Sequence, residues 1–208
     1  MSEKIPPYMM MSCLKMCPRD EVFASVLNPP YLKYSPMNIL QVGAIEKLEL
    51  MFRYGSGWSD LFFASYIQLF GGSLTIVDVD ENHLENSKKV LSGFNVTHTL
   101  IHGDAKNLLE ENPSGFDLIY LDGSNHPDET KDQYDLIDKD ATSIILIDDY
   151  SVKGTTIKHD DRYTGQLVTA TQQGIYVGIN EEALTALTGK IENPKEKVLE
   201  DLKVPCFQ

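Results

Sequence analysis

The chain has 208 residues, 42% of them hydrophobic and 24% charged, which is the usage of a globular protein with room for one sizeable domain. Lysine and arginine number 18 against 31 aspartates and glutamates, and the formal charge of -13 disfavours nucleic acid and anionic membranes as partners. The cysteines fit neither a disulfide framework nor a zinc site, and no apolar run is long enough to cross a bilayer. We therefore expect a cytoplasmic protein.

The sequence divides into three parts. Frequent prolines in residues 1–36 predict an irregular or helical lead-in. Residues 37–180 alternate short apolar runs with helical patterns and make up the expected main domain. Residues 181–208 predict a helical C-terminal tail.

The main domain predicts a mostly parallel sheet, because its strand-like and helix-like segments alternate. The apolar runs typical of buried strands are Met37–Ala44, Ser73–Asp80, His98–Asp104, Phe116–Asp122 and Ser143–Asp149. The helical patterns are Ser59–Phe70, Glu81–Phe94, Ala105–Glu111 and Pro127–Ile137. Gly165–Thr171 and Ile175–Ile179 then flank a glycine-bearing turn and predict an antiparallel hairpin.

A glycine loop and an acidic residue indicate a nucleoside site. Gly55 and Gly57 precede the helix that starts at Ser59, where glycines allow a close approach of backbone to ligand. Asp78 ends the next strand, where a carboxylate can accept hydrogen bonds from both hydroxyls of a ribose. Asp60 stands where the dinucleotide fingerprint needs its third glycine, which disfavours NAD.

The order of these motifs resembles class I S-adenosylmethionine-dependent methyltransferases, particularly the catechol O-methyltransferase-like and related metal-dependent small-molecule O-methyltransferases. The matching segments are Gln41–Ala44, Gly57–Ser59, Val77–Asp78, Gly103–Ala105, Leu121–Gly123 with His126, and Ile147–Tyr150. The resemblance implies a Rossmann-like α/β fold: a mostly parallel seven-stranded sheet, helices on both faces and a C-terminal antiparallel hairpin. It implies S-adenosylmethionine as cofactor, bound by Gly43, Gly55, Gly57, Trp58, Ser59, Asp78, Asp104 and Asp122.

The sequence departs from the family pattern at the first strand. Gln41 stands where the family usually has an acidic residue, and the stretch between Gly43 and Gly57 is longer than usual. We interpret Ile45–Ser56 as an insertion. The alternative makes Leu48–Tyr54 the first strand, with Arg53 in the acidic position.

Three aspartates follow the fourth and fifth predicted strands. Asp122, Asp148 and Asp149 would repel one another unless a cation neutralised them, although strand-end carboxylates also commonly face solvent. The resemblance implies that these three residues bind Mg²⁺, with the reservation that the family often has asparagine at the position of Asp149.

The predicted catalytic residues are Asp122 and His126. His126 resembles the histidine of a D-G-x-H motif, with one extra residue before it, and is a candidate general base. A helix-capping or surface histidine is the alternative interpretation.

The predicted activity is methyl transfer from S-adenosylmethionine to a hydroxyl of a small molecule, such as a phenol, a sugar or a natural product, with Mg²⁺ assistance. The alternative is a cofactor-binding, methyltransferase-like module without transferase activity, motivated by Gln41 and Arg53, which stand where an acidic residue is expected. A nucleic-acid or protein methyltransferase is disfavoured by the charge of -13. The acceptor and the oligomeric state are left open, with a homodimer among the options.

Overall fold

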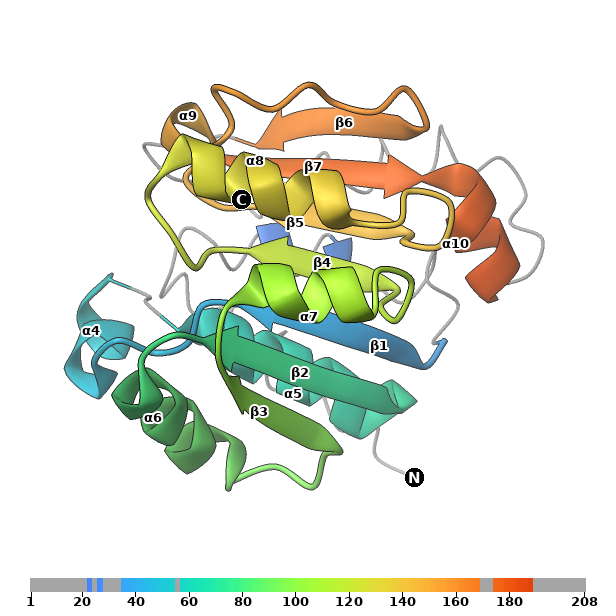
Figure 1. Cartoon of the computed structure of the whole chain (residues 1–208). Helices are drawn as coiled ribbons and strands as arrows, with labels where there is room; N and C mark the ends of the chain where they lie inside the picture. Colours follow the sequence, from blue (N-terminus) through green and yellow to red (C-terminus); the bar gives the residue numbers. More distant parts are fainter. Residues whose placement is uncertain (1–21, 24–25, 28–34, 55–56, 169–173, 189–208) are drawn as a thin grey trace, which may run out of the picture.

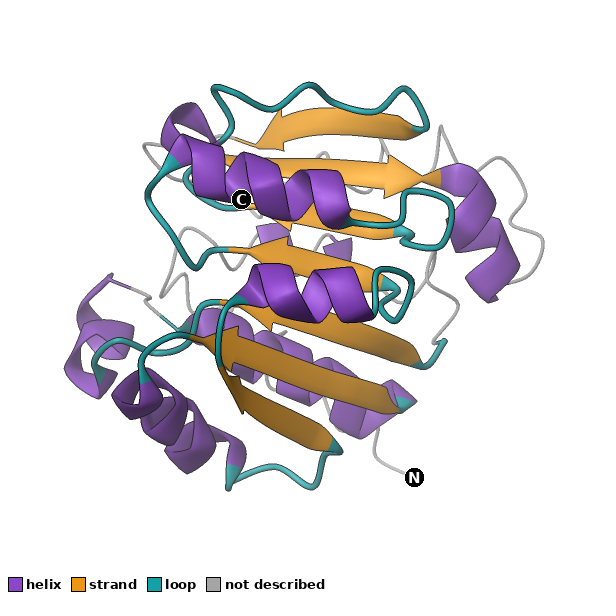
Figure 2. Ribbon diagram, viewed as in Figure 1, coloured by secondary structure: helices purple, strands orange, loops and turns teal. Residues whose placement is uncertain are grey.

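A computed structural model describes residues 22–23, 26–27, 35–54, 57–168 and 174–188. It contains a seven-stranded sheet in the order β3-β2-β1-β4-β5-β7-β6, with helices on both faces (Figures 1 and 2). The strands are β1 (Met37–Val42), β2 (Gly72–Asp78), β3 (His98–His102), β4 (Leu118–Leu121), β5 (Ile144–Ile147), β6 (Tyr163–Val168) and β7 (Ile175–Asn180). The helices are α4 (Leu48–Tyr54), α5 (Trp58–Phe70), α6 (Glu81–Leu91), α7 (Ala105–Glu111), α8 (Pro127–Leu136), α9 (Tyr150–Lys153) and α10 (Glu181–Thr188).

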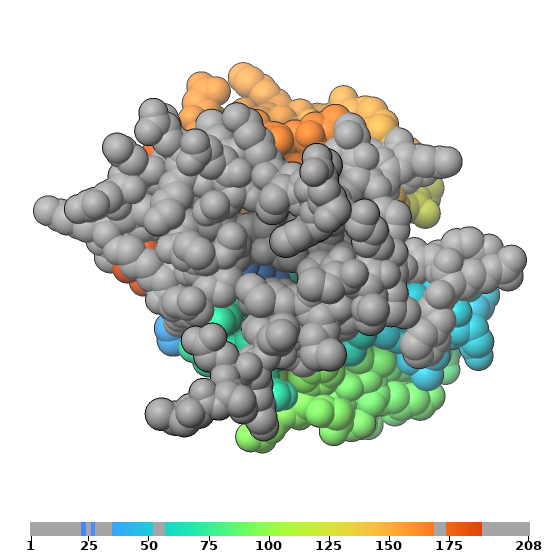
Figure 3. Space-filling model, turned by 180° about the vertical axis from the view of Figure 1, so that it is seen from behind, coloured from blue at the N-terminus to red at the C-terminus, as the bar shows by residue number. Residues whose placement is uncertain are grey.

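The predicted fold class is confirmed. Strands β1 to β5 pair in parallel, while β7 runs antiparallel to both β5 and β6. The predicted hairpin is the β6–β7 pair, although residues 169–173 of its turn lie outside the described part of the chain. Seen from behind, the green β3 end and the orange β6 end lie at opposite sides of the molecule (Figure 3).

The segment between Gly43 and Gly57 contains a helix. Met37–Val42 forms the first strand and pairs with both β2 and β4, whereas Leu48–Tyr54 folds as α4. Met37–Val42 is therefore confirmed as the first strand, and the alternative that made Leu48–Tyr54 the first strand is wrong. That Ile45–Ser56 is an insertion remains a prediction. A strand between two parallel neighbours is buried on both faces, which suits Ile39 and Leu40 better than a run containing Glu49.

Two apolar layers cover the sheet. On one face, Phe62 and Phe63 of α5 pack with Phe23, and the rings of Phe23 and Phe63 contact Tyr120 of β4. On the other face, α7 and α8 lie side by side over β1, β4 and β5, in front of the sheet in Figure 1. Alternate residues of β4 therefore belong to different layers, and the strand ends between the layers remain accessible to a ligand.

Among the described residues, no helix has the length and apolar character needed to span a membrane.

Candidate functional site

A cavity of about 300 Å³ lies at the carboxyl ends of the first four strands. Its wall comes from Val42–Gly43, Val77–Val79, Gly103–Lys106 and Gly123–Ser124, with Glu129 and Gln133 contributed by α8. This is the edge at which open α/β sheets bind ligands, and the volume is at the lower end of the range for small-molecule sites. Of the predicted cofactor-binding residues, Gly43, Asp78 and Asp104 line this cavity.

Gly43 allows β1 and β4 to approach closely beneath the cavity. Its φ of 97° lies in the left-handed region, and a Cβ at this position would lie 2.8 Å from the carbonyl oxygen of Asp122. The Gly43 amide donates to the carbonyl of Val77, at 2.9 Å. A larger residue at position 43 would therefore push apart the strand ends that form the site.

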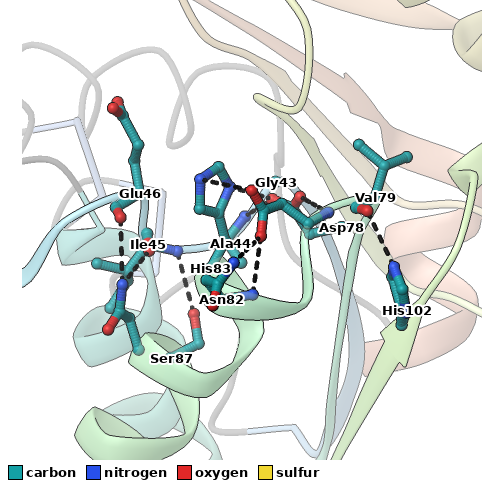
Figure 4. Close-up of polar contacts among 12 residues, drawn as sticks. Gly43, Ala44, Ile45, Glu46, Asp78, Val79, Asn82, His83, Ser87 and His102 are labelled. Atoms are coloured by element: carbon teal, nitrogen blue, oxygen red, sulfur yellow. Dashed lines mark hydrogen bonds and ion pairs between the residues drawn. The ribbon is translucent and has the colours of Figure 1, made fainter.

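Asp78 projects from the end of β2 towards the loop that follows β1 (Figure 4). Its Oδ2 accepts a hydrogen bond from the Ala44 amide at 2.8 Å, and its Oδ1 accepts one from the Asp80 amide at 2.8 Å. His83 Nδ1 lies 3.3 Å from Oδ2. These contacts fix the carboxylate, and because each oxygen can accept more than one hydrogen bond, it keeps capacity for ligand hydroxyls.

Asp104 is the N-cap of α7, at the wall of the same cavity. Its Oδ1 accepts a hydrogen bond from the Lys106 amide at 2.9 Å, which satisfies one of the free amides of the first helical turn. Gly103 precedes it and donates to the carbonyl of Asp78, at 3.0 Å. The ends of β2 and β3 are thus linked directly at the cavity.

The segment that begins α5 is packed into the protein rather than lining the cavity. Trp58 and Ser59 are buried, and the Trp58 indole nitrogen donates to the carbonyl of Met51 in α4, at 2.6 Å. A Cβ at Gly57 would lie 2.4 Å from the Ile45 side chain. Gly55 lies outside the described residues. Cofactor contacts by these four predicted residues remain a prediction.

Gln41, which occupies the usual acidic position, has an acidic partner from α5. Its Nε2 donates to Asp60 Oδ1 at 2.7 Å and to the carbonyl of Gly43 at 2.8 Å. Asp60 is fully buried, and burial raises the pKa of its carboxyl to about 6, against lowering contributions from Ser87 and Gln41. Sequence reasoning identified Asp60 only as a missing glycine and did not predict this pair.

The three predicted metal ligands lie together, as their positions after β4 and β5 suggested. Ligand oxygens of Asp122, Asp148 and Asp149 lie within 4.8 Å of one another. The Tyr120 hydroxyl is 2.8 Å from Asp148 Oδ2 and 3.1 Å from Asp122 Oδ2, and the Asp149 amide donates to Asp148 Oδ1 at 2.9 Å. Asp149 has a φ of 47°, a left-handed conformation that aspartate tolerates better than most residues.

Lys153, which sequence reasoning did not select, carries the positive charge in this cluster. Its Nζ lies 2.6 Å from Asp122 Oδ1 and 3.7 Å from Asp149 Oδ2, and its side chain is only 2% exposed. Burial alone would lower the pKa of Lys153, but the carboxylates of Asp122, Asp148 and Asp149 outweigh it and hold the pKa above its usual value. The side chain is therefore an ammonium.

The Lys153 ammonium competes with a Mg²⁺ ion for this position. The carboxylates are suitable donors for Mg²⁺, but an ion on either oxygen of Asp122 would lie within about 7 Å of the ammonium, given metal–oxygen bonds of about 2.1 Å. At an effective dielectric constant of about 20, the repulsion between ion and ammonium is about 5 kcal/mol or more, and it opposes the attraction that the three carboxylates offer the ion.

His126 is exposed at the N-cap of α8, on the loop that follows β4. Its backbone amide donates to Ser124 Oγ at 3.0 Å, and its carbonyl accepts from the Thr130 amide at 3.2 Å. The imidazole makes no capping hydrogen bond to the helix. Its predicted role as a base remains a prediction.

A larger cavity of about 610 Å³ lies elsewhere, between the end of α8 and the segment before β6. Lys139 and Arg162 are among its lining residues, together with several aspartates. This region precedes β5 and β6 and so lies towards the opposite sheet edge from the strand-end aspartates. It is separate from the site described above.

The comparisons with known proteins agree with this fold. The family model described as a methyltransferase domain matches residues 53–150, and no match is found among curated proteins. The solved structure of the SAH-bound Podospora anserina methyltransferase PaMTH1 is similar at a TM-score of 0.54 and 15% identity, over 85% of this chain and 89% of that chain. The putative methyltransferase yhhF from Escherichia coli is similar at a TM-score of 0.55 and 11% identity, over 78% and 84%.

A protein from Corynebacterium glutamicum is also similar, with a TM-score of 0.54 and 11% identity over 86% of this chain and 91% of that chain. At such identities the solved structures establish the fold only. The chain therefore has the class I S-adenosylmethionine-dependent methyltransferase fold and carries the match to a methyltransferase domain over residues 53–150, which confirms the predicted resemblance to class I methyltransferases.

Proposed function

We propose that the protein transfers a methyl group from S-adenosylmethionine to a hydroxyl of a small molecule. The observation that carries this proposal is the cavity at the strand ends, which is lined by both Asp78 and Asp104. The methyltransferase-domain match over residues 53–150 supports the same activity. SAH is bound in the similar Podospora anserina structure, which supports the choice of cofactor.

The cavity residues fit a nucleoside. Asp78 carries carboxylate oxygens that can accept hydrogen bonds from ribose hydroxyls, and the adjacent strand end at Gly103 leaves backbone accessible beside it. Gly43, at the end of β1, lines the same cavity. S-adenosylmethionine, when bound, supplies a methyl group activated by its sulfonium charge.

The acceptor would lie beside Asp122, at the end of β4. The Asp122 side chain is 29% exposed, so its carboxylate can accept a hydrogen bond from an acceptor hydroxyl and take up its proton. His126, on the same loop, is a second candidate for this proton. Because methyl transfer needs the nucleophile in line with the methyl group, orientation by these residues contributes more than strong acid-base chemistry.

Calorimetric titration with S-adenosylmethionine and S-adenosylhomocysteine tests the cofactor half of the proposal. We expect micromolar binding by the unaltered protein and binding weakened by about 10-fold or more in Asp78→Asn, because the amide cannot offer two acceptor oxygens. Glu85→Gln removes an exposed carboxylate on α6 and is the matched control, expected to bind normally. Absence of binding by the unaltered protein would refute the proposal.

Turnover distinguishes the enzyme from a binding module. We expect a panel of phenols, sugars and other alcohols to include at least one compound methylated in the presence of S-adenosylmethionine. Tight cofactor binding without methylation of any hydroxyl would instead support the alternative, a methyltransferase-like module without transferase activity.

A further inference from the structure

We propose that the Lys153 ammonium takes the place of a divalent cation among the three aspartates, so that acceptor methylation proceeds without metal. The catalytic half of this inference rests on the proposed function. The structural half, that Lys153 fills the cation position, stands independently of it.

The position of Lys153 follows from the local fold. Asp149 ends the turn after β5 and caps the short helix α9, and Lys153 lies four residues later on the same helix face. This spacing returns the lysine side chain to the strand end, where its Nζ meets Asp122 Oδ1 at 2.6 Å. One ammonium therefore bridges the loops that follow β4 and β5.

Described residues supply a hydrogen-bond donor or a cation to each carboxylate. Asp122 receives Lys153 and the Tyr120 hydroxyl, Asp148 receives the same hydroxyl and the Asp149 amide, and Asp149 lies 3.7 Å from the ammonium. Asp148 is fully buried and Lys153 nearly so. Buried carboxylates and ammonium groups require partners of opposite charge, and Lys153 is the positively charged partner of the aspartates.

The arrangement makes Lys153 a positioning residue for Asp122. It holds one carboxylate oxygen, while the Asp122 side chain stays 29% exposed towards the edge where an acceptor would bind. A metal centre would favour acceptors with two neighbouring oxygens that chelate the ion. With an ammonium in that position, an acceptor with a single hydroxyl should be methylated as well as a vicinal diol.

Direct binding of Mn²⁺, measured by electron paramagnetic resonance in the absence of cofactor, tests the structural half. The unaltered protein should bind no Mn²⁺ at this cluster at about 1 mM, whereas Lys153→Met should gain a site with at least about 10-fold tighter binding. The site should disappear in the double variant Lys153→Met/Asp148→Asn. Lys88→Met, which removes an exposed lysine on α6, is the control and should behave as the unaltered protein.

Two results would overturn the structural half. One is micromolar Mn²⁺ binding by the unaltered protein that is lost in Asp148→Asn. The other is a folded Lys153→Met that binds Mn²⁺ no better than the unaltered protein. The first requires no lysine variant, so the proposal stays open to refutation even if Lys153→Met does not fold.

Activity tests the catalytic half once an acceptor is known. We expect turnover by the unaltered protein to change less than about twofold between excess chelator and added Mg²⁺, and to fall about 10- to 100-fold in Lys153→Met. Added Mn²⁺ should partly restore kcat in that variant, with little change in KM for S-adenosylmethionine. A purely structural lysine would give no such rescue, and loss of activity of the unaltered protein in chelator would contradict the proposal.

Discussion

The buried carboxyl of Asp60 should make the stability of the protein depend on pH in a defined interval. Gln41 Nε2 donates to Asp60 Oδ1 at 2.7 Å, while Gln41 Oε1 is buried without a hydrogen-bond partner among the described residues. An ionised Asp60 brings no proton to this pair. A protonated Asp60 provides a donor, which agrees with the increase in its pKa through burial.

The size and sign of the effect follow from linkage. The pKa of Asp60 is 3.8 without the fold and about 6 within it, and at about 1.4 kcal/mol per pH unit this interval corresponds to about 3 kcal/mol. The folded-state pKa is the higher one, so its stabilising contribution is fully present below pH 3.8. It is lost as the pH rises towards about 6.

Asp60→Asn removes this titration and keeps the size and shape of the side chain. We expect its free energy of unfolding, measured in urea at pH values from about 4 to 8, to rise relative to the unaltered protein by about 2 to 3 kcal/mol across that range. Glu85→Gln, at an exposed position on α6, controls for the loss of a carboxylate in general. A difference between Asp60→Asn and the unaltered protein that stays constant with pH would refute the reasoning.

Two further substitutions test the packing of β2 and of α5. Gly72→Ala should lower the free energy of unfolding by about 3 kcal/mol, because φ is 103° and the new Cβ would lie 2.0 Å from the Met37 carbonyl oxygen. The control Gly93→Ala should lower it much less, because its Cβ would meet nothing closer than 3.5 Å. Equal losses of stability in thermal unfolding would contradict this prediction. Trp58→Phe should lower the free energy of unfolding, measured in urea, by about 1 to 2 kcal/mol, because the Met51 carbonyl loses its hydrogen-bond donor. An unchanged urea midpoint would show that this hydrogen bond contributes nothing to stability.

The strands could be predicted because their burial is encoded locally. Runs such as Ile144–Ile147 are apolar at every position, and a central parallel strand is the element that buries both faces. The strand boundaries predicted from the sequence extend beyond the residues that pair in the sheet. Ser143–Asp149 was predicted as a strand, whereas β5 covers only Ile144–Ile147. Its terminal aspartates belong to the loop, which is why they are available at the site.

The helix α4 and the contacts of α5 were not predictable in the same way. Leu48–Tyr54 carries mixed polar and apolar residues over too few turns for a clear period, so its helical state depends on tertiary contacts such as that between Met51 and Trp58. Trp58 and Ser59 matched a cofactor motif by sequence, yet both are buried away from the cavity wall. Their motif position coincides with the start of α5, and their contacts with a cofactor remain a prediction.

The charged partners of the site residues were the hardest feature to predict from the sequence, because they come from distant parts of the chain. The three aspartates at strand ends suggested a missing cation, and Gln41 was noted as a departure from the family pattern. The fold supplies Lys153 to the aspartates and Asp60 to Gln41. Lys153 belongs to no motif that was compared, and Asp60 was compared only with a glycine of the dinucleotide fingerprint, so pattern comparison could not predict either pairing.

The spacing of Asp149 and Lys153 nevertheless contained a usable signal. An acidic residue followed four positions later by a lysine places both on one face of a helix, in the favourable order of charges. That signal applies only if the segment after β5 is helical, and α9 is a single turn, too short to be predicted from its own periodicity. A sequence that places a lysine one turn beyond a strand-end aspartate pair should therefore be examined for an internal cation before a metal ion is assigned.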